Sequence, residues 1–307
     1  MRETQITIFN RKGRKALSCL VSRVVLFAHS PLFSALMFVT IVLGLASPMP
    51  ALGDTIFALT TSNRLLRFDS NTPSVILDTI PITGLQSGES ILGIDFRPTT
   101  GQLYALSGTN RLYIIDLTSG AATQIGSDGA FVLDGNVFGF DFNPVPDRIR
   151  VVSNNEQNLR LNPNDGTLAG TDAGLAYASG DINETVDPNI VAAAYTNNSG
   201  DATTTTLYVI DFGLDILARQ GGVNVPPGTP SPNDGQLFTV GSLGVAAFRL
   251  VGFDIASSNG IAFAAFRSPG NSTSQLYTIN LLTGKATLVG SIGVNRRIVG
   301  LSVSPTD

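Results

Sequence analysis

Three aspartates occupy the same place in a repeated phrase of this sequence. Each phrase runs glycine, apolar residue, aspartate, apolar residue, and the three copies contain Asp95, Asp141 and Asp254. Carboxylates held in pairs can carry out glycoside hydrolysis, one as acid and the other as base or nucleophile. If the repeats surround an axis, these three could approach one another and act on a substrate. The competing interpretation, which we favour, is structural: each aspartate accepts hydrogen bonds from backbone in its own repeat.

The remaining residue types exclude most other catalytic chemistry. The only cysteine and the only histidine, Cys19 and His29, both lie in the first 53 residues. Without that segment the chain cannot form a Ser-His-Asp or Cys-His site or a zinc site, since these need histidine or cysteine. It also lacks a Gly-Lys-Ser/Thr phosphate loop. We therefore expect no cofactor and no metal site. Only three glutamates could join the aspartates in catalysis: Glu89, Glu156 and Glu184.

A second candidate site is a polar hairpin loop that departs from the repeat more than any other. It could bind a glycan through hydrogen bonds or hold Ca²⁺ through oxygen ligands. As a calcium loop it fails, because aligning Gly166 with the required glycine puts Leu161 and Pro163 at the first and third ligand positions. The alternative is a solvated hairpin loop. The ligand-binding candidates are Asn154, Asn155, Glu156, Gln157, Arg160 and Asn162.

The spacing of the phrase sets the architecture that must position these residues. Its copies begin at Gly93, Gly139, Gly252 and Gly300, with a weaker copy at 191–195. Each of the first three is followed by short strands of alternating pattern with glycine-containing turns between them, as in 103–126. Four such strands in sequence form one blade of a propeller. We predict an all-β fold, a five-bladed β-propeller with four-stranded antiparallel blades.

The two ends of the repeat region complement each other. Residues 55–58 begin a unit without its first strand, and 298–304 form a first strand without the rest. We expect the C-terminal strand to complete the N-terminal blade and close the ring, which removes open sheet edges. The fourth unit is ambiguous: 207–211 has the pattern of a third strand at the place of a second, and 223–235 reads as a long exposed loop. A sixth, degenerate blade stays open as an alternative.

The first 53 residues have the pattern of a targeting segment. A basic stretch precedes an uncharged apolar run, and small residues then lead up to Asp54. This order is typical of a signal peptide. We expect residues 1–53 to be a secretory signal and 54–307 a single propeller domain. The alternative is an uncleaved anchor, since 24–53 is long enough to span a bilayer.

The predicted domain is acidic. Residues 1–53 hold six of the 19 basic residues and one of the 23 acidic ones, so residues 54–307 hold 13 basic and 22 acidic residues. Nucleic acid needs clustered lysine and arginine against its phosphates. We therefore expect no nucleic-acid partner, and contact with a membrane only through the N-terminal segment if it stays uncleaved.

Several segments in order resemble a bacterial family, the domain-of-unknown-function family 4394, whose members are mostly secreted. The segments that carry the resemblance are 157–163, 191–197, 206–211, 233–237 and 239–244. The resemblance covers nearly all of residues 55–305. It implies no catalytic role for any residue, because the family has no established activity to carry over.

These observations lead to two hypotheses about function. The first is a secreted, non-catalytic propeller that acts as a binding or scaffold module, with an extracellular protein or a glycan as partner. The second is a carboxylate-dependent glycoside hydrolase or lyase that works at the propeller channel. The second needs two carboxyl groups that face one open pocket, roughly 5–10 Å apart.

Overall fold

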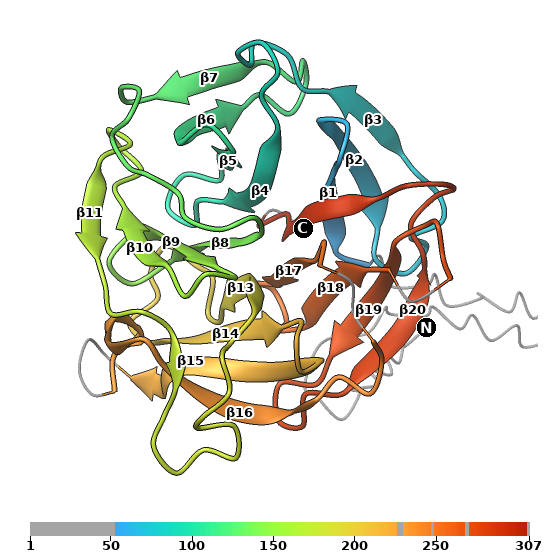
Figure 1. Ribbon diagram of the computed structural model, residues 1–307. Helices are drawn as coiled ribbons and strands as arrows, with labels where there is room; N and C mark the ends of the chain where they lie inside the picture. Colours follow the sequence, from blue (N-terminus) through green and yellow to red (C-terminus); the bar gives the residue numbers. More distant parts are fainter. Residues whose placement is uncertain (1–52, 226–229, 247–248, 268–269, 306–307) are drawn as a thin grey trace, which may run out of the picture. The chain divides into compact units, whose positions relative to one another are not determined.

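The computed structural model describes residues 53–225, 230–246, 249–267 and 270–305. Figure 1 shows five sheets arranged around one axis, each a blade of an all-β propeller. The inner strands of neighbouring blades contact one another around the axis. The predicted signal segment, 1–53, lies outside the described residues apart from Gly53. In the described part of the chain, no helix is long and apolar enough to cross a membrane.

Blades 1, 2 and 3 contain four antiparallel strands each, and the inner strand of blade 1 comes from the C-terminal end of the chain. Blade 1 consists, from the axis outward, of β21 (Ile298–Val303), β1 (Thr55–Thr60), β2 (Arg64–Asp69) and β3 (Asp78–Pro81). Blade 2 consists of β4 (Ile91–Phe96), β5 (Leu103–Ser107), β6 (Arg111–Ile115) and β7 (Ala122–Ile125). Blade 3 consists of β8 (Phe138–Asn143), β9 (Arg148–Ser153), β10 (Asn158–Leu161) and β11 (Leu168–Thr171).

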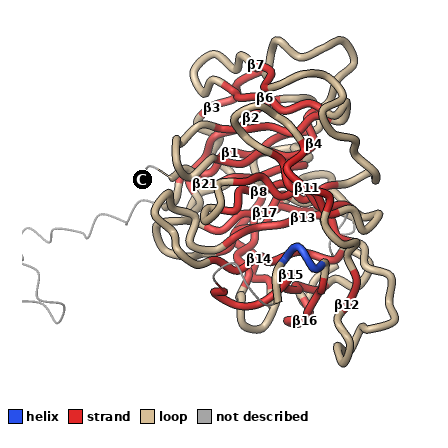
Figure 2. Tube along the Cα trace, turned by 90° about the vertical axis from the view of Figure 1, so that its left-hand side faces the viewer, coloured by secondary structure: helices blue, strands red, loops and turns tan. Residues whose placement is uncertain are grey.

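Blades 4 and 5 complete the set. Blade 4 consists of β13 (Ile190–Tyr195), β14 (Thr205–Asp211), β15 (Ile216–Val225), β16 (Gln236–Ser242) and β12 (Ala176–Tyr177). Blade 5 consists of β17 (Gly252–Ile255), β18 (Ala262–Phe266), β19 (Gln275–Ile279) and β20 (Ala286–Ser291). A short 3-10 helix, η1 (Pro232–Asp234), lies beside β15, as Figure 2 shows.

The fourth blade is where the sequence-based prediction needs correction. It has five strands rather than four, because β12 adds to its outer edge in parallel with β16. The segment 207–211 belongs to β14, the second strand, although its pattern resembles a third. The segment 223–235 is not one long loop, since β15 runs to Val225 and η1 covers 232–234. The described residues form five blades and leave no unit for a sixth.

The C-terminal strand forms the inner strand of the first blade. β21 pairs with β1 in antiparallel register, with Ala58 opposite Leu301. The other three strands of that blade come from the beginning of the described chain, so the sheet joins both ends of the domain.

A hairpin turn of the third strand explains one part of the repeat. In blade 2, the Asp116 carboxylate accepts hydrogen bonds from the backbone N–H groups of Thr118 and Ser119. Gly120 follows with φ of +75°, a conformation that favours glycine. A side chain there would also meet the Pro81 carbonyl oxygen of blade 1 at 2.1 Å. The glycine therefore allows both the turn and the close contact with blade 1.

The glycine of the inner-strand phrase has a different role. A Cβ atom at Gly93 would lie 2.7 Å from the Cβ atom of Phe140 in the neighbouring blade. The absence of a side chain therefore lets the inner strands of blades 2 and 3 approach closely near the axis. Outside this layer, large side chains fill the space between blades, as where Tyr104 packs edge-on against Phe142 with ring centroids 5.1 Å apart.

Candidate functional site

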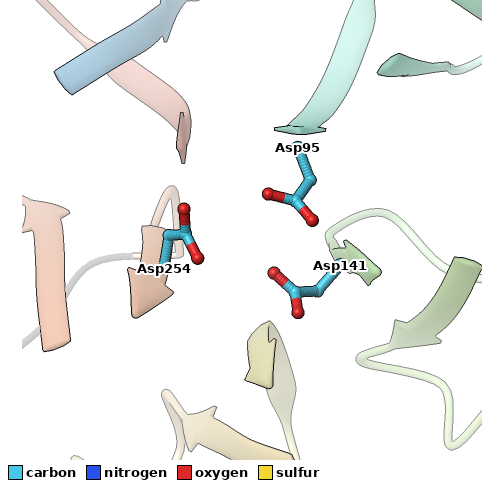
Figure 3. A group of neighbouring side chains, drawn as sticks. All are labelled: Asp95, Asp141 and Asp254. Atoms are coloured by element: carbon cyan, nitrogen blue, oxygen red, sulfur yellow. The ribbon is translucent and has the colours of Figure 1, made fainter. Parts of the chain in front are cut away.

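The three phrase aspartates meet at the propeller axis. Asp95 lies on β4, Asp141 on β8 and Asp254 on β17, and one oxygen from each lies within 4.8 Å of the other two. Figure 3 shows the three carboxylates pointing toward one another from three different blades. Each residue is only 1% exposed to solvent. We call these three side chains the axial cluster.

Each aspartate also binds the backbone of the next blade. Asp95 Oδ2 accepts a hydrogen bond from Phe142 N at 2.8 Å, and Asp141 Oδ2 accepts one from Tyr195 N at 2.7 Å. Asp254 Oδ2 accepts one from Val303 N at 2.6 Å. We expected these aspartates to accept hydrogen bonds from the backbone of their own repeat. That expectation is wrong for these three bonds, whose donors lie in the following blade. The side chain ties each blade to its neighbour instead.

The two blades without an aspartate at this position complete the pattern differently. In blade 1 the position holds Ser302, whose Oγ accepts a hydrogen bond from Phe96 N at 3.2 Å. The same Oγ lies 2.8 Å from Asp95 Oδ1 and 3.1 Å from Asp254 Oδ2, and its one proton can be donated to either. In blade 4 the position holds Ala194, which offers no acceptor.

Asp254 compensates for that missing acceptor. The N–H group of Ile255, which would face blade 4, donates at 2.6 Å to Oδ1 of Asp254 itself. This contact lies within blade 5, unlike the bonds from Phe142, Tyr195 and Val303. It uses Oδ1 of Asp254 and leaves Oδ2 to accept from Val303 N of blade 1.

The electrostatics of the axial cluster disfavour full ionisation. At an effective dielectric constant of about 20, two unit charges 4.8 Å apart repel by about 3 kcal/mol. Burial, together with the neighbouring charge of Asp254, raises the pKa of Asp95 well above its usual value. Burial and the charges of Asp95 and Asp254 do the same to the pKa of Asp141. Burial raises the pKa of Asp254 to about 7.

The axial cluster has no room for a sugar ring. The neighbouring cavity has a volume of about 10 Å³, about the space of one water molecule. Its walls are apolar side chains and backbone of the inner strands, among them Phe140, Phe253 and Leu301. Glycoside hydrolysis needs an open site that admits the substrate and a water molecule. The geometry therefore gives the hydrolase hypothesis no support at this position.

The three candidate glutamates lie away from the axis. Glu89 is buried in blade 2, where its carboxylate accepts hydrogen bonds from Ser107, Thr109 and Tyr113, the last at 2.7 Å. Burial raises the pKa of Glu89, but these donors outweigh it and lower the pKa to about 2. Glu184 accepts from Gly180 N in an exposed loop.

The polar stretch predicted as a ligand site is divided between separate places. Asn154 lies in the β9–β10 turn, and its Oδ1 accepts from the backbone N–H groups of Asn136 and Val137. Asn155 and Gln157 bind residues 132–134 of the same loop. Glu156 shares this turn, where it has a positive φ and a pKa raised by burial and by Asp187 and Asp134.

The other two residues of that stretch lie elsewhere. Arg160 forms an ion pair with Asp172, with Nη2 and Oδ1 2.8 Å apart. Asn162 lies in the β10–β11 turn, where its Oδ1 accepts from Asn164 N. The six predicted residues therefore do not form one site, and the described contacts of Asn154, Asn155 and Gln157 brace the 132–137 loop.

An open cavity lies at the face braced by Asn154, and its residues were not predicted from the sequence. Its volume is about 540 Å³, and it is lined by Asn136, Val137, Arg249, Leu250 and Arg267. Val137 comes directly before β8 of blade 3, and Leu250 lies two residues before β17 of blade 5. The cavity is therefore the mouth of the propeller at the end where these strands begin, and the axial cluster lies further along the same strands. We call it the arginine mouth.

One comparison with known proteins shows the family of this chain, and none shows an activity. The model of a family described as a domain of unknown function (DUF4394) matches residues 64–302. A protein of unknown function from Bacteroides thetaiotaomicron VPI-5482 is similar at 17% identity, with a TM-score of 0.45 over 83% of this chain and 62% of that chain. The chain thus spans less than two thirds of that structure.

A crystal structure of a nidogen/laminin complex is also similar, at 13% identity with a TM-score of 0.46, over 82% of this chain and 98% of that chain. Among curated proteins, no sequence matches this chain. Neither structure is similar enough to carry an argument about what this chain binds.

Proposed function

This chain belongs to the domain-of-unknown-function family DUF4394, and we propose that it is a secreted, non-catalytic binding module that takes an acidic glycan at the arginine mouth. The observation that carries the proposal is the pair of arginines, Arg249 and Arg267, on the wall of one open cavity in an otherwise acidic domain. Secretion rests on the order of basic, apolar and small residues in 1–53.

The chemistry of the mouth suits an anionic sugar. Among the described residues, no ion pair involves Arg249, so its guanidinium is available to a ligand anion. Guanidinium groups bind carboxylates and sulfates through paired hydrogen bonds. Asn136 adds an amide for hydroxyl groups, and Val137 and Leu250 offer apolar contact to a sugar face. A volume of about 540 Å³ falls in the usual range for small-ligand sites.

Two features favour binding without catalysis. The described residues that line the mouth are arginines, an asparagine and apolar residues, and none of them is an acid or a histidine that could serve as a general acid or base. The carboxylates of the axial cluster are each only 1% exposed and do not line this opening.

Calorimetric titration with uronic-acid oligosaccharides and their neutral counterparts tests the proposal. We expect binding of the acidic sugars, weakened at least tenfold by Arg249→Gln and by raised salt. Lys285→Gln is the matched control, because Lys285 is exposed in the β19–β20 turn and does not line the mouth. Equal binding of neutral sugars, or binding of acidic peptides alone, would overturn the glycan assignment.

The secretion claim has its own test. Mass spectrometry of the protein recovered outside the producing cells should show an N-terminus near Asp54. Intact Met1 in a membrane fraction would instead support the anchor hypothesis.

A further inference from the structure

The axial cluster has the geometry of a cation site. One oxygen each from Asp95, Asp141 and Asp254 lies within 4.8 Å of the other two. Three points that far apart share a centre about 2.8 Å from each (4.8/√3), and a closer arrangement shortens that distance. Ca²⁺ binds carboxylate oxygens at about 2.3–2.6 Å. A small rotation of the carboxylates therefore brings all three to one ion.

A second observation points to a ligand at the same place. Asp141 Oδ2 is bonded to Tyr195 N, but Asp141 Oδ1 is buried, and among the described residues only a proton shared with the Asp95 carboxyl group would give it a hydrogen bond. Figure 3 shows one oxygen of Asp141 directed toward the other two carboxylates. Burying a carboxylate oxygen without a partner is costly, so an atom that satisfies it stabilises the fold.

The charge of the axial cluster needs a positive counterpart. None of the ion pairs formed in the described part of the chain involves Asp95, Asp141 or Asp254. The counterpart must then be a proton or a bound cation. All donors around the centre are oxygens, from the three carboxylates and Ser302 Oγ, and such donors select hard cations over zinc or copper.

We propose that Asp95, Asp141 and Asp254 bind one calcium ion at the propeller axis. The ion would join blades 2, 3 and 5, which supply one carboxylate each, and would satisfy Asp141 Oδ1. This site is separate from the arginine mouth, and the proposal does not depend on glycan binding.

Because the site is buried, the experiment loads it during refolding. The full chain is unfolded in denaturant and refolded with EDTA or with CaCl₂, and bound metal is then counted by inductively coupled plasma mass spectrometry. We expect one calcium per chain after refolding with CaCl₂ and a higher melting temperature than after refolding with EDTA, since an ion that binds the native state stabilises it. NaCl at matched ionic strength should not reproduce the rise.

Asp141→Asn is the decisive variant. Its amide oxygen can still accept the hydrogen bond from Tyr195 N, but the charge directed at the centre is lost. We expect calcium affinity to fall at least tenfold and the difference in melting temperature between CaCl₂ and EDTA to disappear. Asp128→Asn, at an exposed carboxylate paired with Arg111, should leave both unchanged.

Two results would overturn the proposal. One is refolded wild-type protein without stoichiometric calcium. The other is an Asp141→Asn variant that melts at the same or a higher temperature in both buffers, which would show that shared protons alone neutralise the axial cluster. The metal count on the wild-type chain decides the question even if the variant does not fold.

Discussion

Two buried carboxylate sites in this chain are opposites in their surroundings. Glu89 lies among hydroxyl donors from Ser107, Thr109 and Tyr113, and an arginine, Arg111, lies 3.5 Å from it. The carboxylates of the axial cluster face one another. Burial raises the pKa in both places. Donors outweigh it at Glu89, whereas neighbouring charges add to it at Asp95 and Asp141.

The two sites also differ in what they hold together. The side-chain donors to the Glu89 carboxylate all belong to blade 2, so this group fixes the hairpins of one blade. The carboxylates of the axial cluster accept from the backbone of the following blade. The Glu89 carboxylate thus has its hydrogen-bond donors within one blade, whereas carboxylates that repel one another lie where blades 2, 3 and 5 meet. The axial cluster is the place where a bound proton or ion can change the stability of the whole ring.

Removing the C-terminal strand should cause the largest loss of stability, because it disrupts the axial cluster while the Glu89 site keeps its donors. Deletion of 298–307 removes Ser302 and Val303 from the axial cluster and exposes the edge of β1. Blade 2 retains every side-chain donor to Glu89. We expect loss of the cooperative unfolding transition for the entire domain, measured by circular dichroism and calorimetry.

Truncation after Ser304 is the control for that deletion, because it retains the whole of β21. It should melt as the full chain does. An unchanged melting curve for the longer deletion would show that the blades do not depend on this strand and that the axial contacts are dispensable.

Much of this architecture could be predicted from the sequence because it is local. The Gly-apolar-Asp phrase marks the inner strand, and a turn such as that of Asp116 and Gly120 marks the hairpin that follows the third strand. The ambiguous segment 207–211 shows the limit of pattern alone. Its composition resembles that of a third strand, but it pairs with β13 and β15 and is therefore the second strand of blade 4.

The candidate sites were less accessible to sequence reasoning. The repeat position of Asp95, Asp141 and Asp254 indicated that they could meet, whereas their bonding to the next blade depends on how inner strands are offset around the axis. Arg249 and Arg267 belong to no motif. They lie in different loops of the chain and come together only because both loops open onto the same face, which no local pattern reveals.

A second variant tests the Glu89 site, where the buried carboxylate has several hydrogen-bond donors. Glu89→Gln replaces a charged acceptor by an amide whose N–H₂ group must face hydroxyl donors and Arg111. We expect a loss of about 3 kcal/mol in the free energy of unfolding at pH 7, since hydrogen bonds to a buried charge are lost. Urea denaturation measures it. Glu184→Gln, in an exposed loop, should change the stability by less than about 0.5 kcal/mol.

The pH dependence of that loss follows from the sign of the shift. The pKa of Glu89 is lowered to about 2 in the folded chain, so its contribution is present above the ordinary glutamate range near pH 4.5 and is lost as the pH falls toward 2. The difference between wild type and Glu89→Gln should therefore shrink over this range. A difference that stays constant down to pH 2 would contradict a stabilising role for the charge.

Asp254→Asn should give the smallest effect and the opposite sign. Because burial raises the pKa of Asp254 to about 7, the folded chain holds a proton that the unfolded chain releases near pH 4. The stability of wild type in EDTA should then fall as the pH rises from 4 through 7, and the variant should escape this fall. We expect Asp254→Asn to be about 1 kcal/mol more stable than wild type at pH 9 and no more stable at pH 5, measured by urea denaturation. If it is less stable than wild type at both pH values, as Glu89→Gln is expected to be at neutral pH, then the two carboxylate sites do not differ in the way their surroundings indicate.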